Sequence, residues 1–216
     1  MLDTLSQLPS AGGAPTSLVV MLHGVGSNKE DLIGLAPYLG PALPRTAFIS
    51  VDGVEACDMA PMGRQWFSLS DRSPARMLAE VARTAPTVHA FLDQVLRDAG
   101  LDESRMALLG FSQGTMMSLN LGLQRKKTPA GIVGFSGALL AGDDFASTVT
   151  SRPPVQLIHG EEDGVVPFGA MARAKMQMES AGIKVQTLAC PGLAHSIDEA
   201  GLRRAAQFLA DVFAGS

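Results

Sequence analysis

The chain has 216 residues, of which 46% are hydrophobic and 5% aromatic, and its formal net charge is -4 at pH 7. This length suits one domain with a buried sheet and is too short for two, so we expect a single domain over residues 1–216. Because the positive charges form no basic patch, we expect neither nucleic acid nor an anionic membrane as a partner.

We expect neither a targeting segment nor a membrane-spanning segment in this sequence. The start of the chain lacks a positively charged region, and the apolar run at residues 18–22 is too short to cross a membrane. Cys57 and Cys190 form neither a metal-binding spacing nor a disulfide framework, which favours a reducing, cytoplasmic location. A single bridge between these two cysteines stays open.

Short apolar runs alternate with longer helical patterns, as in a mostly parallel sheet covered by helices. Strands are expected at residues 17–22, 47–51, 106–110, 131–135, 155–159 and 185–189. Helices are expected at residues 77–98, 113–124, 170–180 and 197–213.

Several local signals refine this prediction. Pro86 is expected to break or kink the first of these helices, and the pattern from Ser196 to Glu199 predicts a capping box that opens the last one. The basic run at residues 125–127 is expected to close the helix before it. Residues 52–74 form the longest irregular stretch, which is typical of a functional or mobile loop.

The segment Gly110-Phe111-Ser112-Gln113-Gly114 lies between an expected strand and an expected helix. Two glycines around a serine allow the strand to turn sharply into the helix, so that the hydroxyl stands exposed above the sheet. The pattern alone is weak, but this context favours Ser112 as a nucleophile over an incidental serine in a glycine turn.

A nucleophilic serine needs a base, and the base needs an orienting carboxylate. Two histidines follow Ser112 along the chain. His159 ends an expected strand and is interpreted as a packed structural residue. His195 lies in a loop between the last expected strand and the last helix, from which its ring can lean towards the serine. We therefore predict His195 as the base.

The carboxylate is expected just after the strand that ends at His159. Glu161, Glu162 and Asp163 compete there, and Asp163 is favoured because it is short, is followed by a glycine and precedes the next helix. The resemblance described below adds to this preference. Asp198 is assigned to the dipole of its own helix.

Two backbone N–H groups are expected to form an oxyanion hole. One belongs to Gln113, which follows the serine and opens its helix. The other is assigned to Val25 in Leu22-His23-Gly24-Val25-Gly26, where the flanking glycines let the backbone approach a ligand. A plain strand-ending turn is the alternative for that segment. No histidine stands at metal-ligand spacing and no phosphate-binding loop occurs, so we expect no metal and no cofactor.

These segments together resemble the phospholipase/carboxylesterase family, which includes acyl-protein thioesterases and small bacterial carboxylesterases. The resemblance rests on the oxyanion turn at residues 22–26, the elbow at 110–114, an acid loop at 159–167 that places the acid on Asp163, and a histidine loop at 192–196. Trp66-Phe67 is similar to an aromatic pair that the family carries in a long loop near the pocket. The resemblance implies an α/β-hydrolase fold with a mostly parallel central sheet, helices on both faces and no large cap domain.

The chain also departs from the family pattern. Thr115 replaces a third glycine common after the elbow, and the short N-terminal stretch leaves open whether the leading antiparallel strands are trimmed or absent. Dienelactone hydrolases fit the architecture but resemble the chain less, because they carry a cysteine where Ser112 stands.

The predicted function is that of a serine carboxylesterase, which hydrolyses short- to medium-chain esters through an acyl-enzyme without a cofactor. Acyl-thioesters and lysophospholipids are alternative substrates, and a non-catalytic binding module is the alternative from another class. An apolar acyl groove is expected, with ordinary core packing as the other interpretation, and is assigned to Met59, Met62, Trp66, Phe67, Leu139, Leu140, Phe168 and Leu193. Either a monomer or a homodimer is compatible with the sequence.

Overall fold

The computed structural model describes residues 2–215. Its strands are β1 (Thr4–Gln7), β2 (Ser17–Leu22), β3 (Thr46–Val51), β4 (Glu55–Ala56), β5 (Arg64–Gln65), β6 (Met106–Phe111), β7 (Gly131–Phe135), β8 (Val155–Gly160) and β9 (Val185–Cys190). A central sheet has the order β1-β3-β2-β6-β7-β8-β9, in which β1 is antiparallel to β3 and the other neighbours are parallel. The short strands β4 and β5 form a separate antiparallel pair.

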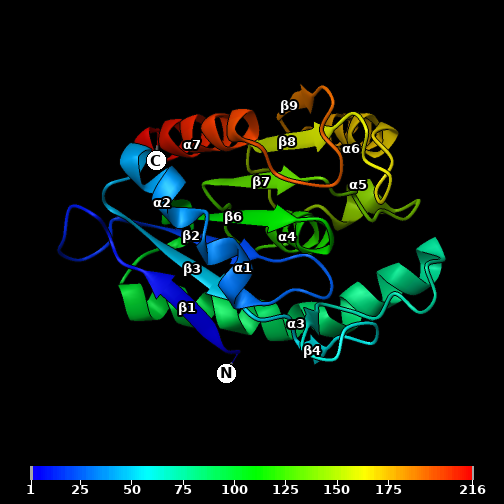
Figure 1. Cartoon of the computed structure of the whole chain (residues 1–216), viewed down its shortest axis with the longest axis horizontal. Helices are drawn as coiled ribbons and strands as arrows, with labels where there is room; N and C mark the ends of the chain where they lie inside the picture. The colour runs from blue at the N-terminus through cyan, green and yellow to red at the C-terminus, as the bar shows by residue number, and fades with distance from the viewer. Residues whose placement is uncertain (1, 216) are drawn as a thin grey trace.

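Helices cover both faces of the central sheet. They are α1 (Lys29–Ile33), α2 (Ala36–Leu39), α3 (Pro74–Ala99), α4 (Gln113–Leu123), α5 (Phe145–Thr148), α6 (Gly169–Ser180) and α7 (Glu199–Ala214), with short 3-10 turns η1 (Gly40–Ala42) and η2 (Glu103–Arg105). Buried side chains of α3, α4 and α6 pack on one face, and those of α1, α2 and α7 pack on the other. Figure 1 shows α7 along the upper margin and α3 along the lower one, with the carboxyl ends of β6, β7 and β8 pointing to the right.

The sequence of β2 explains why this strand is central. All six of its residues are buried. Leu18, Val20 and Leu22 pack in the core shared with α3 and α4, whereas Val19 and Met21 pack in the core shared with α1 and α7. This period of two is that of a strand covered on both faces, so the continuous apolar run correctly predicted a buried parallel strand.

Two predictions at the start of the fold have clear outcomes. One leading antiparallel strand is present, because β1 pairs with the edge of β3. Pro86 was predicted to break or kink its helix, and the break is absent, because α3 continues through Pro86 to Ala99. Pro86 lies on the exposed side of the helix, where water can satisfy the carbonyl that loses its N–H partner, while Ala85 and Val88 hold the helix to the core.

Two predicted helix ends are also wrong. The N-cap of α7 is Asp198, not Ser196, since Asp198 has an extended backbone and its carboxylate accepts the Gly201 N–H at 2.7 Å. The basic run at residues 125–127 follows the end of α4 instead of lying in its last turn. The side chain of Arg125 instead forms ion pairs with Glu103 and Asp93.

Both cysteines are free and buried, so the bridge that the sequence left open is not formed. Within residues 2–215, none of the helices is long and apolar enough to span a bilayer.

Candidate active site

Ser112 stands at a sharp turn between β6 and α4. Its backbone has φ 54° and ψ -116°, a strained conformation for a residue other than glycine, which typically costs about 1–3 kcal/mol. A Cβ at Gly110 would lie 2.4 Å from the backbone of Gly114, and a Cβ at Gly114 would lie 1.8 Å from the carbonyl oxygen of Leu22. Glycine is therefore required at both positions, and the strand turns as predicted.

The turn after β2 lies directly beside this elbow. A Cβ at Gly24 would approach the Phe111 ring at 3.1 Å and the Ser112 Cβ at 3.5 Å. Gln113 is the first residue of α4, so its N–H has no acceptor within the helix. Among the described residues, neither the Val25 N–H nor the Gln113 N–H donates a hydrogen bond. Both backbone groups assigned to the oxyanion hole are thus available close to Ser112.

Asp163 lies in the turn after β8, with no exposed side-chain surface. Its Oδ1 accepts the N–H groups of Val165 and Val166, each at 2.9 Å. Its Oδ2 lies 2.7 Å from His195 Nδ1 and 3.2 Å from His159 Nε2. Burial opposes ionisation, but the hydrogen bonds from His195 and the two amides outweigh it and hold the pKa of Asp163 below its ordinary value.

His195 lies between this carboxylate and the elbow. Because an ionised Asp163 only accepts, Nδ1 of His195 carries a proton, and Nε2 is left as the basic nitrogen. The His195 ring packs against Phe111, the residue before the serine, with 4.8 Å between ring centroids. Within residues 2–215, no hydrogen bond joins His195 to Ser112. Such a bond commonly forms only when substrate is bound.

The structural interpretation of His159 is confirmed. It is buried, its Nε2 donates to the Val166 carbonyl at 2.9 Å, and its ring lies edge-on to Phe168. Its contact with Asp163 was not predicted from the sequence. The spacing of four residues between the two was the available signal, since both flank the same tight turn.

The residues assigned to an acyl groove are in different environments. Trp66 and Phe67 are 0% exposed, so they lie in the core beneath the site and not on the wall of an open groove. Leu139 and Leu140 line two cavities of about 240 and 300 Å³. Phe168 and Leu193 are partly buried, and their contact with substrate stays a prediction. Met59 and Met62 are exposed.

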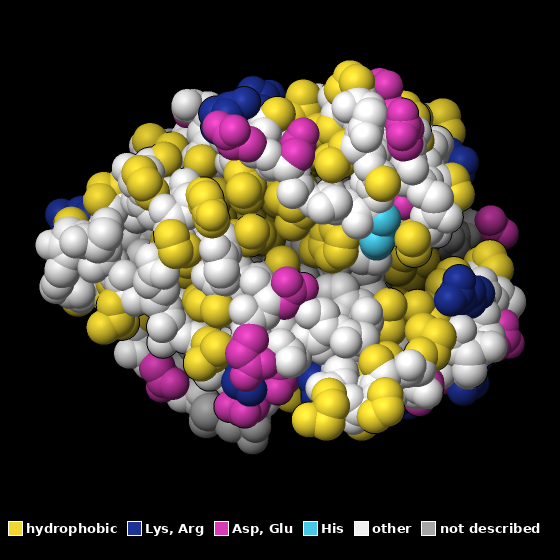
Figure 2. Space-filling view, in the orientation of Figure 1, with side chains coloured by type: hydrophobic (Ala, Val, Ile, Leu, Met, Phe, Trp, Pro, Cys, Tyr) yellow, Lys and Arg dark blue, Asp and Glu magenta, His cyan; other side chains and the backbone are white. Residues whose placement is uncertain are grey.

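Figure 2 shows a hollow on the right of this face, where hydrophobic side chains gather beside a histidine. A separate cavity of about 540 Å³ is lined by Arg125 and other charged residues, and none of Ser112, Asp163 and His195 lines it. Over residues 2–215, no group of three or more histidine, cysteine, aspartate or glutamate side chains is placed to hold a metal ion.

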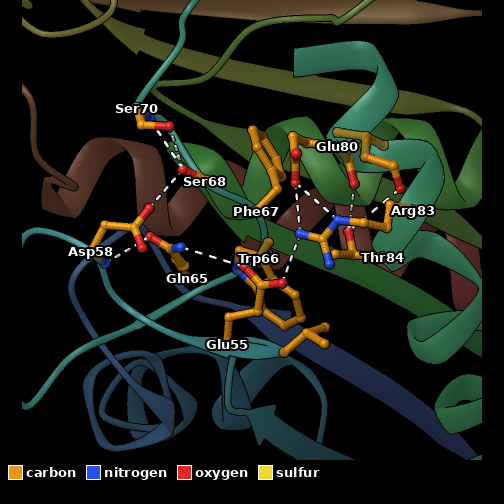
Figure 3. A network of polar contacts seen from close by, with 12 residues as sticks. Glu55, Asp58, Gln65, Trp66, Phe67, Ser68, Ser70, Glu80, Arg83 and Thr84 are labelled. Carbon is orange, nitrogen blue, oxygen red and sulfur yellow. Dashed lines mark hydrogen bonds and ion pairs between the residues drawn. The ribbon is translucent and has the colours of Figure 1, made fainter. Parts of the chain in front are cut away.

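The long loop of residues 52–74 is tied to α3 by an ion pair, which Figure 3 shows. Arg83 of α3 binds Glu55 of β4 at 2.7 Å and Glu80 of its own helix at 2.6 Å. Glu80 is buried and also binds Arg76. On the other side of the loop, Ser68 donates to Asp58, so the segment that carries Trp66 has a fixed path.

The sequence pattern of the phospholipase/carboxylesterase family matches residues 6–213. The chain belongs to this family. Esterase YpfH of Escherichia coli is 30% identical over 194 residues, which are 90% of this chain and 80% of the relative. Acyl-protein thioesterase 1 of Aspergillus fumigatus is 26% identical, covering 91% of this chain and 88% of the relative. The crystal structure of esterase PE8 superposes with a TM-score of 0.93, and its sequence is 34% identical. The match covers 98% of this chain and 99% of that chain.

These comparisons confirm the family that the four motifs predicted. They also confirm the α/β-hydrolase fold with a mostly parallel sheet and no large cap. The chain is thus a member of a family of hydrolases that act on ester bonds.

Proposed function

We propose that this chain is a serine carboxylesterase in which Ser112, His195 and Asp163 form the catalytic triad. His195 takes the proton from the serine hydroxyl as the oxygen attacks the ester carbonyl, and Asp163 fixes the tautomer and stabilises the imidazolium. One observation carries the proposal: the 2.7 Å hydrogen bond from His195 to Asp163, made by a ring that rests on the residue before the strained serine.

The N–H groups of Val25 and Gln113 would hold the negative oxygen of the tetrahedral intermediate, and the loss of one such donor typically costs about 2.7–4 kcal/mol. Collapse of the intermediate releases the alcohol, which takes its proton from His195. His195 then activates a water molecule that hydrolyses the acyl-enzyme and regenerates Ser112. Neither a metal nor a cofactor takes part in this sequence of steps.

Carboxylic esters with short to medium acyl chains are the proposed substrates. Gly137 lies against the Ser112 backbone, since a Cβ on it would be 3.0 Å from the Ser112 carbonyl oxygen. Two residues later the chain reaches Leu139 and Leu140, which line the cavity of about 300 Å³, and His195 and Phe111 line a separate cavity of about 270 Å³. Both volumes are at the lower end for small-ligand sites, which favours a short or medium chain. Acyl-thioesters are the second candidate, because a relative of similar length is named an acyl-protein thioesterase.

The test is hydrolysis of p-nitrophenyl esters from acetate to octanoate by the wild type, Ser112→Ala and Ser180→Ala. Ser180 is an exposed serine at the end of α6 and serves as the matched control. We expect Ser112→Ala to lose several powers of ten in kcat, Ser180→Ala to keep wild-type activity, and a fluorophosphonate probe to label Ser112. Acyl thioesters of the same chain lengths decide between the two substrate classes by kcat/KM. If the wild type neither hydrolyses these esters nor is labelled by the probe, the proposal fails and the alternative of a non-catalytic binding module takes its place.

A further inference from the structure

The two proposed oxyanion donors come from separate parts of the chain, and one short segment of the long loop touches both parts. On the side of the oxyanion turn, Gly26 N–H donates to the Arg64 carbonyl at 2.9 Å, and Arg64 N–H donates to the Ser27 carbonyl at 2.7 Å. The indole Nε1–H of Trp66 donates to the His23 carbonyl at 2.8 Å. Three hydrogen bonds therefore fix the turn that contains Val25 to the loop.

On the side of the elbow, the contact is made by the side chain of Gln113. Its Oε1 accepts the Trp66 N–H at 2.9 Å, and its Nε2 donates to the Phe67 carbonyl at 2.7 Å. The residues involved are fully buried or nearly so. Buried bonds of this kind define position strongly, because an unpaired partner has no water to replace it.

His23 closes the network beneath the oxyanion turn. Gly53 N–H donates to its Nε2 at 2.9 Å, so the proton is on Nδ1, which donates to the Gly24 carbonyl at 2.7 Å. The ring is wholly buried, and its centroid lies 5.4 Å from that of Trp66. Hydrogen bonds to the backbone carbonyl of His23 and to its ring therefore both hold the oxyanion turn in place.

We propose that Trp66 and the side chain of Gln113 are positioning residues that set the distance between the Val25 and Gln113 N–H groups. We call this connection, from Gln113 through Trp66 to His23, the oxyanion bracket. Neither side chain touches a reacting atom, and the inference rests on the proposed function above. Oxyanion donors act only when they lie about 2.7–3.1 Å from the developing charge. If the loss of a bracket bond moves one donor by a fraction of an ångström, the transition state is destabilised more than the bound substrate.

The oxyanion bracket is separable from the attachment of the loop to the rest of the molecule. The ion pair between Arg83 and Glu55, which Figure 3 shows, holds the same loop to α3. Among the described residues, Glu55 accepts a hydrogen bond from Gln65 at 3.4 Å, and neither partner of the ion pair is hydrogen-bonded to Gln113, Trp66 or His23. Loss of a bracket bond should therefore change geometry at the oxyanion hole while the loop stays attached. Loss of the ion pair should lower stability without changing that geometry.

The experiment compares Trp66→Phe, which deletes the indole N–H but keeps a ring, with Gln113→Met, which deletes both side-chain bonds but keeps the backbone N–H. Rates are normalised to the fraction of enzyme labelled by a fluorophosphonate. We expect kcat to fall about 10- to 100-fold in each variant, with KM within twofold of wild type. Affinity for a trifluoromethyl ketone, which mimics the tetrahedral intermediate, should fall by the same factor as kcat.

Arg83→Met is the control, expected to lower Tm while leaving kcat and ketone affinity unchanged. If Trp66→Phe does not fold, Gln113→Met decides alone, since methionine fills a similar volume. Wild-type kcat and ketone affinity in the folded variants, or a change confined to KM, would overturn the inference. A wild type without esterase activity would instead overturn the proposed function, and the inference with it.

Discussion

Replacing Asp163 by asparagine should separate catalysis from folding at this site. The asparagine oxygen can still accept the N–H groups of Val165 and Val166, which now bind Oδ1 at 2.9 Å. Its NH2 group then faces His195 in place of Oδ2. Because an NH2 group cannot accept the Nδ1 proton, the imidazole must move that proton to Nε2, and the nitrogen that should receive the serine proton is blocked.

The two effects differ greatly in size. A wrong tautomer in a triad lowers kcat by about 10⁴, which corresponds to about 5.5 kcal/mol of transition-state stabilisation. The free energy of unfolding at pH 7 should fall by only about 1–2 kcal/mol, because the two amide bonds remain and the loss of a charge-assisted bond is partly offset by not burying a charge.

The assay is p-nitrophenyl ester hydrolysis, with urea unfolding monitored in parallel on the same preparations. Glu162→Gln is the matched control, because Glu162 is the exposed neighbouring acid and makes no contact with His195 among the described residues. We expect it to behave as wild type. If Asp163→Asn keeps more than about a tenth of kcat, or if the control loses as much activity, the assignment of the acid is incorrect.

Three further predictions concern stability. Arg125→Met leaves the buried carboxylate of Glu103 without its main partner and should lower the free energy of unfolding by about 3 kcal/mol in a urea titration. Gly114→Ala places a Cβ 1.8 Å from the Leu22 carbonyl oxygen, so circular dichroism should find no native protein. Burial lowers the pKa of His23 in the folded protein below its value of about 6.5 in the unfolded chain. The contribution of the neutral ring to the free energy of unfolding is therefore lost as the pH falls from about 6.5 through the lower folded pKa. The Tm advantage of wild type over His23→Asn should therefore narrow between pH 7 and pH 5, and a constant difference would contradict this.

Local patterns were sufficient to predict the parallel strands of the central sheet and the elbow. A strand covered on both faces needs an apolar run, and a strand that turns at once into a helix needs glycine where Cβ atoms would collide. Both requirements are visible within five or six residues, as in Ser17–Leu22 and in the segment around Ser112. The residues proposed as acid and base, Asp163 and His195, each follow a strand whose end was already located, and the family resemblance added to the choice of Asp163.

The environment of Trp66 was not predictable in the same way. The sequence places an aromatic pair in a long loop, and an aromatic in a loop is compatible with a groove wall as much as with a core. Its two polar contacts are with His23 and Gln113, which lie 43 and 47 residues away along the chain. No periodicity or spacing encodes such contacts, because they depend on how the sheet brings two distant turns together. The N-cap at Asp198 was missed for a smaller reason, since Ser196 offers the same cap chemistry two residues earlier.

The meeting of the site residues follows from strand order. Strands β2 and β6 are neighbours in parallel register, with Leu22 beside Gly110, so the turn with Val25 and the elbow must emerge side by side. Strands β8 and β9 are neighbours in the same sense, which puts the loops of Asp163 and His195 together. His195 follows β9, and three inter-strand spacings, about 14 Å, separate β9 from β6. The loop after β9 therefore has to carry His195 back across β8 and β7 towards the serine, where its ring lies on Phe111.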